Sequence, residues 1–338
     1  MSSPEPSSMP FDAARPMALT GAGIDRAADR RRRDADWLAT QRDHAGARVV
    51  LLGDAGVRAA NGGIELVSLA DVEAAMALGE SDHANELVLL GVDGDGPIFA
   101  LDEDEPREGH RARLIGAGGM RGEAPPEALD RIGLRVAAQT LTHQEGGLIA
   151  YAAAVLNWHR THRFCSVCSA ATLTGEGGMV RTCPTCGTHH HPRTDPVVIM
   201  LVTDGADRVL LGRQAVWPAR RYSTLAGFVS PGESLEEAVA REVFEEVGVQ
   251  VGLPSYVSSQ PWPFPMSLML GFHVPWTGGD IAGDDDELED ARWFSRDEVV
   301  DATGDDSWEE PRPGEGLLLP PRSAIARRLV EGWLDATA

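Results

Sequence analysis

Lysine is absent from this chain of 338 residues, and all thirty basic residues are arginine. Together with the many alanines and glycines, this bias indicates codon usage in a GC-rich genome rather than a structural device. The chain carries 52 acidic residues and a formal net charge of −22. Because an acidic surface repels a phosphate backbone, the composition argues against general nucleic-acid binding unless a local patch provides it.

Long hydrophobic runs are also missing. The apolar runs are short, such as Val197–Val202, whereas a helix that crosses a membrane needs about 18 apolar residues or more. Residues 1–16 lack the apolar core of a secretory signal and are rich in serine and proline, so we expect a disordered tail there. These absences predict a cytoplasmic protein, in which thiols remain reduced.

The rest of the chain divides into four regions and predicts an α+β fold. Residues 17–146 hold short strand-like runs between Gly and Asp turns, which predicts a small mostly-β domain. Residues 147–164 are rich in helix formers and predict a buried connecting helix. All four cysteines fall within residues 165–192, and residues 193–338 alternate strands with one strong helix. Near the N-terminus, the run Arg30–Arg33 predicts a solvent-exposed helix face, with a binding patch as the alternative.

The cysteines form two CxxC pairs that are separated by fourteen residues. Two such pairs place four thiolates tetrahedrally around Zn²⁺, and reducing surroundings argue against disulfides. Because protein fills all four positions, one such zinc ion per chain is structural. The three histidines that follow are either ordinary loop residues or substrate contacts. The predicted ligands are Cys165, Cys168, Cys183 and Cys186, and the histidines are His189, His190 and His191.

One helix is predicted from Leu235 to Val247. Ser234 and Glu237 have the spacing of a capping box, and apolar residues recur every four positions to form a buried stripe. Three carboxylates project together beside this stripe, at positions i, i+3 and i+4. Carboxylates this close together repel one another unless a cation lies between them, and hard divalent ions such as Mg²⁺ or Mn²⁺ prefer such oxygen ligands. A metal site therefore explains the cluster better than a solvated acidic helix face does. They belong to Glu242, Glu245 and Glu246.

The stretch from Gly227 to Val249 reads G-x5-E-x7-R-E-V-x-E-E-x-G-V, which resembles the Nudix box over its whole length. The resemblance implies the Nudix fold, a mixed sheet between helices. It also implies hydrolysis of a nucleoside diphosphate linked to another moiety, with divalent metals that offset the charge of the pyrophosphate and activate water. The implied catalytic residues are Glu245, Glu246 and Arg241, of which Arg241 orients the glutamates.

Two further features resemble the NADH pyrophosphatase branch of this superfamily: the four-cysteine ribbon and the loop SQPWPFPMS, Ser259–Ser267. The implied reaction is hydrolysis of NAD(H) to NMN(H) and AMP by a homodimer that shares its substrate site. Some members of the branch remove NAD caps from the 5′ end of RNA. This reaction is an alternative main activity. Hydrolysis of another ADP-linked metabolite such as ADP-ribose, and a non-catalytic zinc-ribbon binding module, are the remaining alternatives.

The resemblance also assigns site residues. The implied divalent-metal ligands are the backbone carbonyl of Ala226, Glu242, Glu246 and a later acid. The segment ELEDARWF is similar to a family pattern whose first glutamate is Glu287 here, with Asp284, Asp285 and Asp286 as competing candidates. The implied substrate-binding residues are His191, Gln260, Pro261, Trp262, Pro263, Phe264, Pro265, Met266, Ser267 and Ala326. His191 stands where the family usually has tyrosine.

The loop has a physical reading of its own. Trp262 and Phe264 are two residues apart, so in an extended segment their rings leave on the same side. Three neighbouring prolines restrict the backbone in advance and reduce the entropy lost on binding. We expect these rings to stack on the flat bases of NAD(H), with Gln260 and Ser267 bonding base or ribose edges. The alternative is that the rings pack into a core or a dimer interface.

Overall fold

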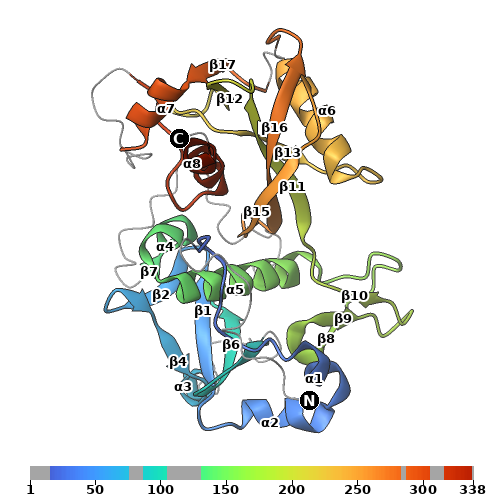
Figure 1. Cartoon of the computed structure of the whole chain (residues 1–338). Coiled ribbons are helices and arrows are strands. Elements are labelled where there is room, and N and C mark those ends of the chain that lie inside the picture. Colours follow the sequence, from blue (N-terminus) through green and yellow to red (C-terminus); the bar gives the residue numbers. More distant parts are fainter. Residues whose placement is uncertain (1–15, 76–86, 105–130, 283–286, 305–315, 337–338) are drawn as a thin grey trace. The chain divides into compact units, whose positions relative to one another are not determined.

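The computed structural model of the protein describes residues 16–75, 87–104, 131–282, 287–304 and 316–336 (Figure 1). The predicted tail, apart from Pro16, lies outside these ranges. The chain forms two compact units, Met1–Thr194 with Pro261–Met266 and Asp195–Gln260 with Ser267–Ala338. The sequence had placed residues 193–338 in one domain, so the segment Pro261–Met266 departs from that division. Within the described ranges, no helix is both long enough and apolar enough to span a bilayer.

The first unit is built on a seven-stranded sheet. Its strands run in the order β3-β2-β1-β6-β5, with β4 also paired to β1 and β7 to β2. The β1–β6 pair is parallel and the other pairs are antiparallel. The strands are β1 Arg48–Gly53, β2 Gly56–Ala60, β3 Gly63–Ile64, β4 Leu66–Ser68, β5 Val88–Asp93, β6 Gly96–Asp102 and β7 Arg131–Ile132.

Alternating side chains along the strands of this sheet pack into two apolar cores, one on each face. Val50 and Leu52 of β1 belong to a buried cluster that includes residues of α5, whereas Val49 and Leu51 belong to a second cluster on the other side. This is the period-two alternation of a strand that is covered on both faces. The α-helices of this unit within the described ranges are α1 Ala28–Arg33, α2 Ala35–Arg42, α3 Leu69–Ala75, α4 Leu134–Thr140 and α5 His143–Thr161.

The connecting helix differs from the predicted range 147–164. Helix α5 begins at His143 because Thr142 and Glu145 form a complete capping box, which satisfies free amides of the first turn. It ends at Thr161, because Phe164 already forms a bridge with Ala171 and belongs to the zinc ribbon. The predicted helix therefore exists but lies a few residues earlier in the chain.

The arginine run is only partly exposed, which corrects the prediction for Arg30–Arg33. The side chain of Arg31 is buried and donates hydrogen bonds to the carbonyl oxygens of Leu89 and Leu90. These are backbone groups of β5, so the guanidinium anchors α1 to the sheet. Its neighbours Arg30, Arg32 and Arg33 remain exposed.

The zinc ribbon follows α5 and is a three-stranded antiparallel sheet in the order β10-β9-β8. A 3₁₀ turn, η4 Glu176–Gly178, joins its first two strands. The strands are β8 Leu173–Gly175, β9 Val180–Thr182 and β10 His189–His190.

The second unit is a mixed seven-stranded sheet between helices. Its order is β14-β16-β11-β12-β17, with β13 paired to β11 and β15 to β16, and its β11–β16 pair is parallel. The elements are β11 Asp195–Thr203, β12 Arg208–Arg213, β13 Leu225–Phe228, α6 Leu235–Val247, β14 Gln250–Val251, β15 Ser255–Trp262, β16 Ser267–Gly278, β17 Asp290–Ser295, α7 Arg296–Ala302 and α8 Ile325–Ala336.

Helices α6 and α8 cover opposite faces of this sheet. The buried valines of α6 pack with Val198 and Met200 of β11. Ile199 of β11 is paired with Gly271 of β16, and a Cβ at Gly271 would lie 2.9 Å from Ile325 Cδ1 of α8. Since Ile199 points away from Val198 and Met200, α8 lies on the face opposite α6. The apolar side of α6 is therefore packed on the sheet, and Glu242 and Glu246 lie beside it against β13.

Candidate functional site

The helix that carries the glutamates has the predicted boundaries. Helix α6 runs from Leu235 to Val247, and the Ser234–Glu237 capping box is complete. Gly248 ends it in the left-handed conformation at φ 74°, which glycine adopts without steric cost. Val239, Val243 and Val247 are fully buried. Local signals and a well-packed apolar face therefore fix where the neighbouring carboxylates lie.

Arg241 is the centre of an ion-pair network that orients these carboxylates. Its guanidinium donates to both carboxylate oxygens of Glu233 (2.5 and 2.9 Å), to Glu242 Oε1 (2.8 Å) and to Glu245 Oε2 (2.8 Å). It also donates to the carbonyl oxygen of Phe228 (2.9 Å). The hydrogen bonds from Arg241 lower the pKa of Glu233 to about 2. Arg241 thus contacts two of the three clustered glutamates directly, and its orienting role stays a prediction.

Glu242 is held against the backbone at Gly227. A Cβ at this glycine would lie 1.9 Å from the carboxyl carbon of Glu242, so any larger residue would displace the carboxylate. The Glu242 side chain is only 13% exposed. Burial raises its pKa, and the hydrogen bond from Arg241 acts in the opposite direction. Position 227 therefore has to be glycine, because any side chain there would occupy the place of the Glu242 carboxylate.

Glu246 is the most deeply buried acid of the cluster. It is 5% exposed, and its Oε2 has no hydrogen-bond partner among the described residues. Burial raises the pKa of Glu246 to about 8, and the charges of Glu287 and Glu242 act in the same direction, whereas a hydrogen bond from the Ala226 backbone opposes them. A buried carboxylate oxygen without a partner is costly unless a cation meets it.

These residues fit a hard divalent cation. Glu287 influences both Glu242 and Glu246 electrostatically, so it lies near them, while its competitors Asp284, Asp285 and Asp286 lie outside the described ranges. The Ala226 backbone, the fourth implied contributor, adjoins Glu246. Glu245 differs from the others because its side chain is 57% exposed. The donor set is made of oxygen atoms alone, which Mg²⁺ and Mn²⁺ prefer.

The four cysteines are arranged for zinc. Their ligand atoms lie within 4.8 Å of one another, and no other group of three or more such residues in the described ranges is as compact. Sulfur–sulfur distances of 3.4, 3.5 and 3.6 Å link Cys168 with Cys183, Cys168 with Cys186, and Cys165 with Cys186. Hydrogen bonds from the side chain and backbone of Thr188 lower the pKa of Cys186 to about 6. Four thiols gathered within bonding reach of one ion fit a closed structural zinc site.

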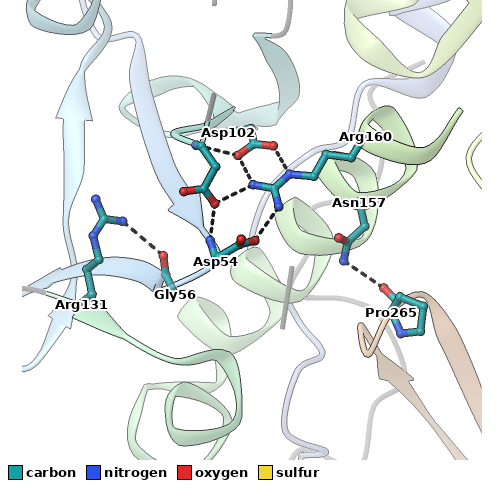
Figure 2. A network of polar contacts seen from close by, with 8 residues as sticks. Asp54, Gly56, Asp102, Arg131, Asn157, Arg160 and Pro265 are labelled. Carbon is teal, nitrogen blue, oxygen red and sulfur yellow. Dashed lines mark hydrogen bonds and ion pairs between the residues drawn. The ribbon is translucent and has the colours of Figure 1, made fainter. Parts of the chain in front are cut away.

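The aromatic loop belongs to the first unit. The rings of Trp262 and Phe264 meet edge to face with centroids 4.9 Å apart, and Phe264 packs against the apolar core that contains α5. Asn157 of α5 donates to the carbonyl oxygen of Pro265 at 3.3 Å (Figure 2). The guanidinium carbon of Arg135 lies 4.4 Å from the Phe264 ring centroid and 5.7 Å from that of Trp262. The loop is thus held by packing of Phe264 and by a hydrogen bond from α5, and its contact with a substrate stays a prediction.

Several residues with an implied substrate role are not exposed. Gln260 is fully buried, and its amide bonds Ser323 O (2.8 Å) and the Ile325 N–H (2.9 Å) at the start of α8. Pro263, Met266, Ser267 and Ala326 are also buried, whereas His191 is exposed. Polar contacts of the Gln260 side chain therefore support the fold. The sequence carried no signal for Asn157 or Arg135, which lie more than one hundred residues before the loop.

A second polar network in the first unit fixes the end of α5 to the sheet. The guanidinium of Arg160 pairs with buried Asp102, with Asp54 at 2.7 Å and with Asp104 at 2.8 Å (Figure 2). Burial raises the pKa of Asp102, although Arg160 opposes the shift. One guanidinium thus holds three carboxylates of the sheet ends beside the last turn of α5, which is the arrangement of a structural contact.

Comparison with known protein families accounts for all three parts of the chain. The NUDIX domain matches residues 193–312, the NADH pyrophosphatase zinc ribbon domain matches residues 160–190, and the NADH pyrophosphatase-like rudimentary NUDIX domain matches residues 37–158. The first sheet, the ribbon and the second sheet therefore each have a counterpart in one family of proteins.

Curated relatives agree with this assignment. A protein of Stutzerimonas stutzeri named NAD-capped RNA hydrolase NudC is 39% identical over 254 residues, or 74% of this chain and 79% of that protein. A protein of the same name from Mycobacterium bovis is 44% identical over 62% of this chain and 66% of the relative, just under two thirds of its length. NAD-capped RNA hydrolase NUDT12 of Macaca fascicularis is 44% identical over 57% of this chain and 43% of that protein. The chain belongs to the NADH pyrophosphatase family of Nudix hydrolases.

Proposed function

We propose that the protein hydrolyses the pyrophosphate bond of NAD(H) to give NMN(H) and AMP. The observation that carries the proposal is the carboxylate cluster around Glu246, whose buried Oε2 has no hydrogen-bond partner among the described residues. An isolated acidic helix face would be solvated, whereas here Glu242 and Glu246 are largely buried, Arg241 orients Glu242, and Gly227 leaves room for its carboxylate. Such a site is suited to bring divalent cations to a charged diphosphate.

The chain's own residues have distinct tasks in this reaction. Glu242, Glu246, Glu287 and the carbonyl of Ala226 would hold Mg²⁺ or Mn²⁺, which offsets phosphate charge and makes water a better nucleophile. Arg241 keeps Glu242 and Glu245 in position through its hydrogen bonds. Glu245 is the exposed carboxylate of the set, which makes it the candidate to accept a proton from the attacking water. The water oxygen bonds to one phosphorus while the bridging P–O bond breaks.

The aromatic loop is the proposed source of selectivity for NAD(H). Its rings are only partly buried, so they retain surface for a nicotinamide or adenine ring. Arg135 places a positive charge beside the same rings, which suits a substrate that carries phosphates. The exposed His191 is a further candidate contact, and in the homodimer that we infer it would complete a shared site. Sedimentation of the purified protein tests the dimer.

Removal of NAD from the 5′ end of RNA is the second candidate activity. The names of the curated relatives favour it, and the two reactions break the same bond. The net charge of −22 weighs against tight binding of a long RNA unless a local surface compensates. A cytoplasmic location, which fits either substrate, also remains a proposal that fractionation of cells would test.

A competition assay distinguishes the two activities. Purified protein with Mg²⁺ or Mn²⁺ is given equal concentrations of NADH and NAD-capped RNA, and NMN(H), AMP and 5′-monophosphorylated RNA are quantified. We expect both substrates to be cleaved, with their relative kcat/KM defining the main activity. ADP-ribose serves as the substrate without nicotinamide. If neither NADH nor NAD-capped RNA yields NMN(H) while ADP-ribose is cleaved, the assignment to NAD(H) is overturned.

A further inference from the structure

The zinc ribbon has two faces of different character. In antiparallel strands, residues that oppose one another point to the same side of the sheet. The register of β8, β9 and β10 therefore forms one row of Leu173, Thr182 and His189. Phe164 is bridged to Ala171, which lies two residues before Leu173 and so shares its side. We call the residues Phe164, Leu173, Thr182 and His189 the outer ribbon face.

The opposite face is already occupied by the protein. It carries Arg181, which is buried. The Arg181 guanidinium donates to Thr172 Oγ1 (2.8 Å), Thr172 O (3.2 Å) and His159 Nδ1 (2.8 Å). His159 in turn bonds the carbonyl oxygen of Gly178 at 2.8 Å. These contacts tie the inner face to α5 and leave the outer ribbon face as the exposed one.

The apolar side chains of the outer ribbon face are exposed to solvent. Phe164 is 66% exposed and Leu173 63%. Thr182 Oγ1 and His189 Nδ1 lie 3.1 Å apart and add a polar edge. One flat ring beside aliphatic and hydrogen-bonding groups is the composition of a surface on which a nucleobase stacks.

The charge around this face differs from that of the whole chain. Between Gly146 and Thr194 the sequence has a single acidic residue, Glu176, against four arginines. Arg163 adjoins Phe164, is exposed and forms none of the ion pairs found in the described ranges. Four thiolates around Zn²⁺ leave two formal negative charges, so the ribbon is weakly charged rather than basic. A phosphate backbone is tolerated here, while stacking supplies most of the attraction.

We propose that the outer ribbon face binds unpaired nucleotides near the 5′ end of an NAD-capped RNA, with one base stacked on Phe164. Arg163 contacts a backbone phosphate of the same segment. This inference rests on the proposed hydrolysis of NAD-linked substrates, and it assigns the RNA chain a site of its own in a protein with a net charge of −22. Free NAD(H) has no RNA chain and does not use this face.

The test compares variants on free NADH and on an NAD-capped RNA of about twenty unpaired nucleotides. Phe164→Ala should raise KM for the RNA by roughly five- to tenfold, because stacking of one base is lost. Phe164→Trp should restore it, and kcat/KM for NADH should stay within about twofold in both variants. Arg163→Gln should reduce the slope of log KM against log salt by about 0.7. Leu253→Ala, at an exposed apolar residue of the second unit (82% exposed), is the control.

Specific outcomes would overturn the proposal. Unchanged KM for the RNA in Phe164→Ala, with zinc content intact, would show that the face does not bind RNA. An equal loss on NADH would assign Phe164 to the catalytic site, and a change of sedimentation coefficient would assign the face to a contact between copies. An RNA whose first nucleotides are base-paired should lose the effect of Phe164→Ala; persistence of the effect would exclude stacking. If the unaltered protein cleaves neither substrate, the proposed hydrolysis itself fails.

Discussion

Burial of the Glu246 carboxyl group and the negative charges beside it both disfavour its ionised form. Both raise its pKa, to about 8, and its Oε2 has no partner in the described ranges. We predict that Glu246→Gln lowers kcat by at least about a hundredfold, the scale of losing electrostatic stabilisation in a transition state. The melting temperature of the metal-free protein should not fall, because burial already disfavours the charged form. Steady-state kinetics and calorimetry test both parts.

The control for this substitution is Glu236→Gln, an exposed glutamate in the first turn of α6. It changes the charge of the same helix without touching the carboxylate cluster, so its kcat should stay near that of the unaltered protein. Near-normal turnover of Glu246→Gln with Mg²⁺ would contradict the metal-binding role.

His159 makes the first unit sensitive to acid. Burial and the nearby charge of Arg181 together lower the pKa of His159 to about 4, although the hydrogen bond to Gly178 opposes the shift. The unfolded chain, with an ordinary histidine pKa of about 6.5, binds more protons between pH 4 and pH 6.5. Stability is therefore constant above this window and falls as the pH drops through it, by about 2 kcal/mol at pH 5.

Denaturant unfolding at pH 7.5 and pH 5 measures this dependence. His159→Gln retains a donor and an acceptor but does not titrate, so its loss of stability between the two pH values should be smaller than that of the unaltered protein. Equal losses would mean that His159 is charged in the folded state or that another group dominates.

Among the elements, helix α6 could be predicted to the residue and α5 could not. Both helices begin with a capping box, but the box of α6 precedes a clear apolar stripe that ends at a glycine. Helix α5 is apolar on most sides, so its periodicity gave no boundary, and the Thr142–Glu145 signal was missed. The burial of Arg31 had no local signal, because its acceptors lie in β5, almost sixty residues later.

The ribbon depends on its metal as an element. Its strands are two or three residues long, too short to hold a sheet together without another constraint. We predict that Cys183→Ser loses the stoichiometric zinc and lowers the melting temperature, because zinc binding is folding free energy at such a site. Elemental analysis and calorimetry check this, with exposed Ser166→Ala in the same cysteine loop as control. Less than about one zinc per chain in the native protein would refute the site.

The aromatic loop allows packing and recognition to be separated. Phe264→Leu keeps most of the apolar volume against the core but removes the ring. We expect it to raise KM for NADH by roughly tenfold and to change the melting temperature little. Phe264→Ala should do the same to KM and also lose roughly 2 kcal/mol of stability, since the side chain is partly buried. An unaltered KM in Phe264→Leu would leave only the structural role.

For the whole molecule, the sequence indicated the carboxylate cluster of one helix but not the division of the chain into two units. A continuous motif specified Glu242 and Glu246, because every member of the cluster except Glu287 lies within one loop and one helix. The grouping of Pro261–Met266 with the first unit could not be foreseen. It depends on Asn157 and Arg135, and contacts between distant parts of a chain leave no periodic trace in either part.

This grouping makes the chain pass between the two units three times, at residues 194/195, 260/261 and 266/267. A gene fusion that joined the first 194 residues of a relative to the remainder of this protein would look like an exchange of whole domains. It would in fact seat Trp262 and Phe264 on a foreign α4 and α5. The six-residue loop and its support therefore have to be inherited together, and functional chimeras require that both be taken from the same parent.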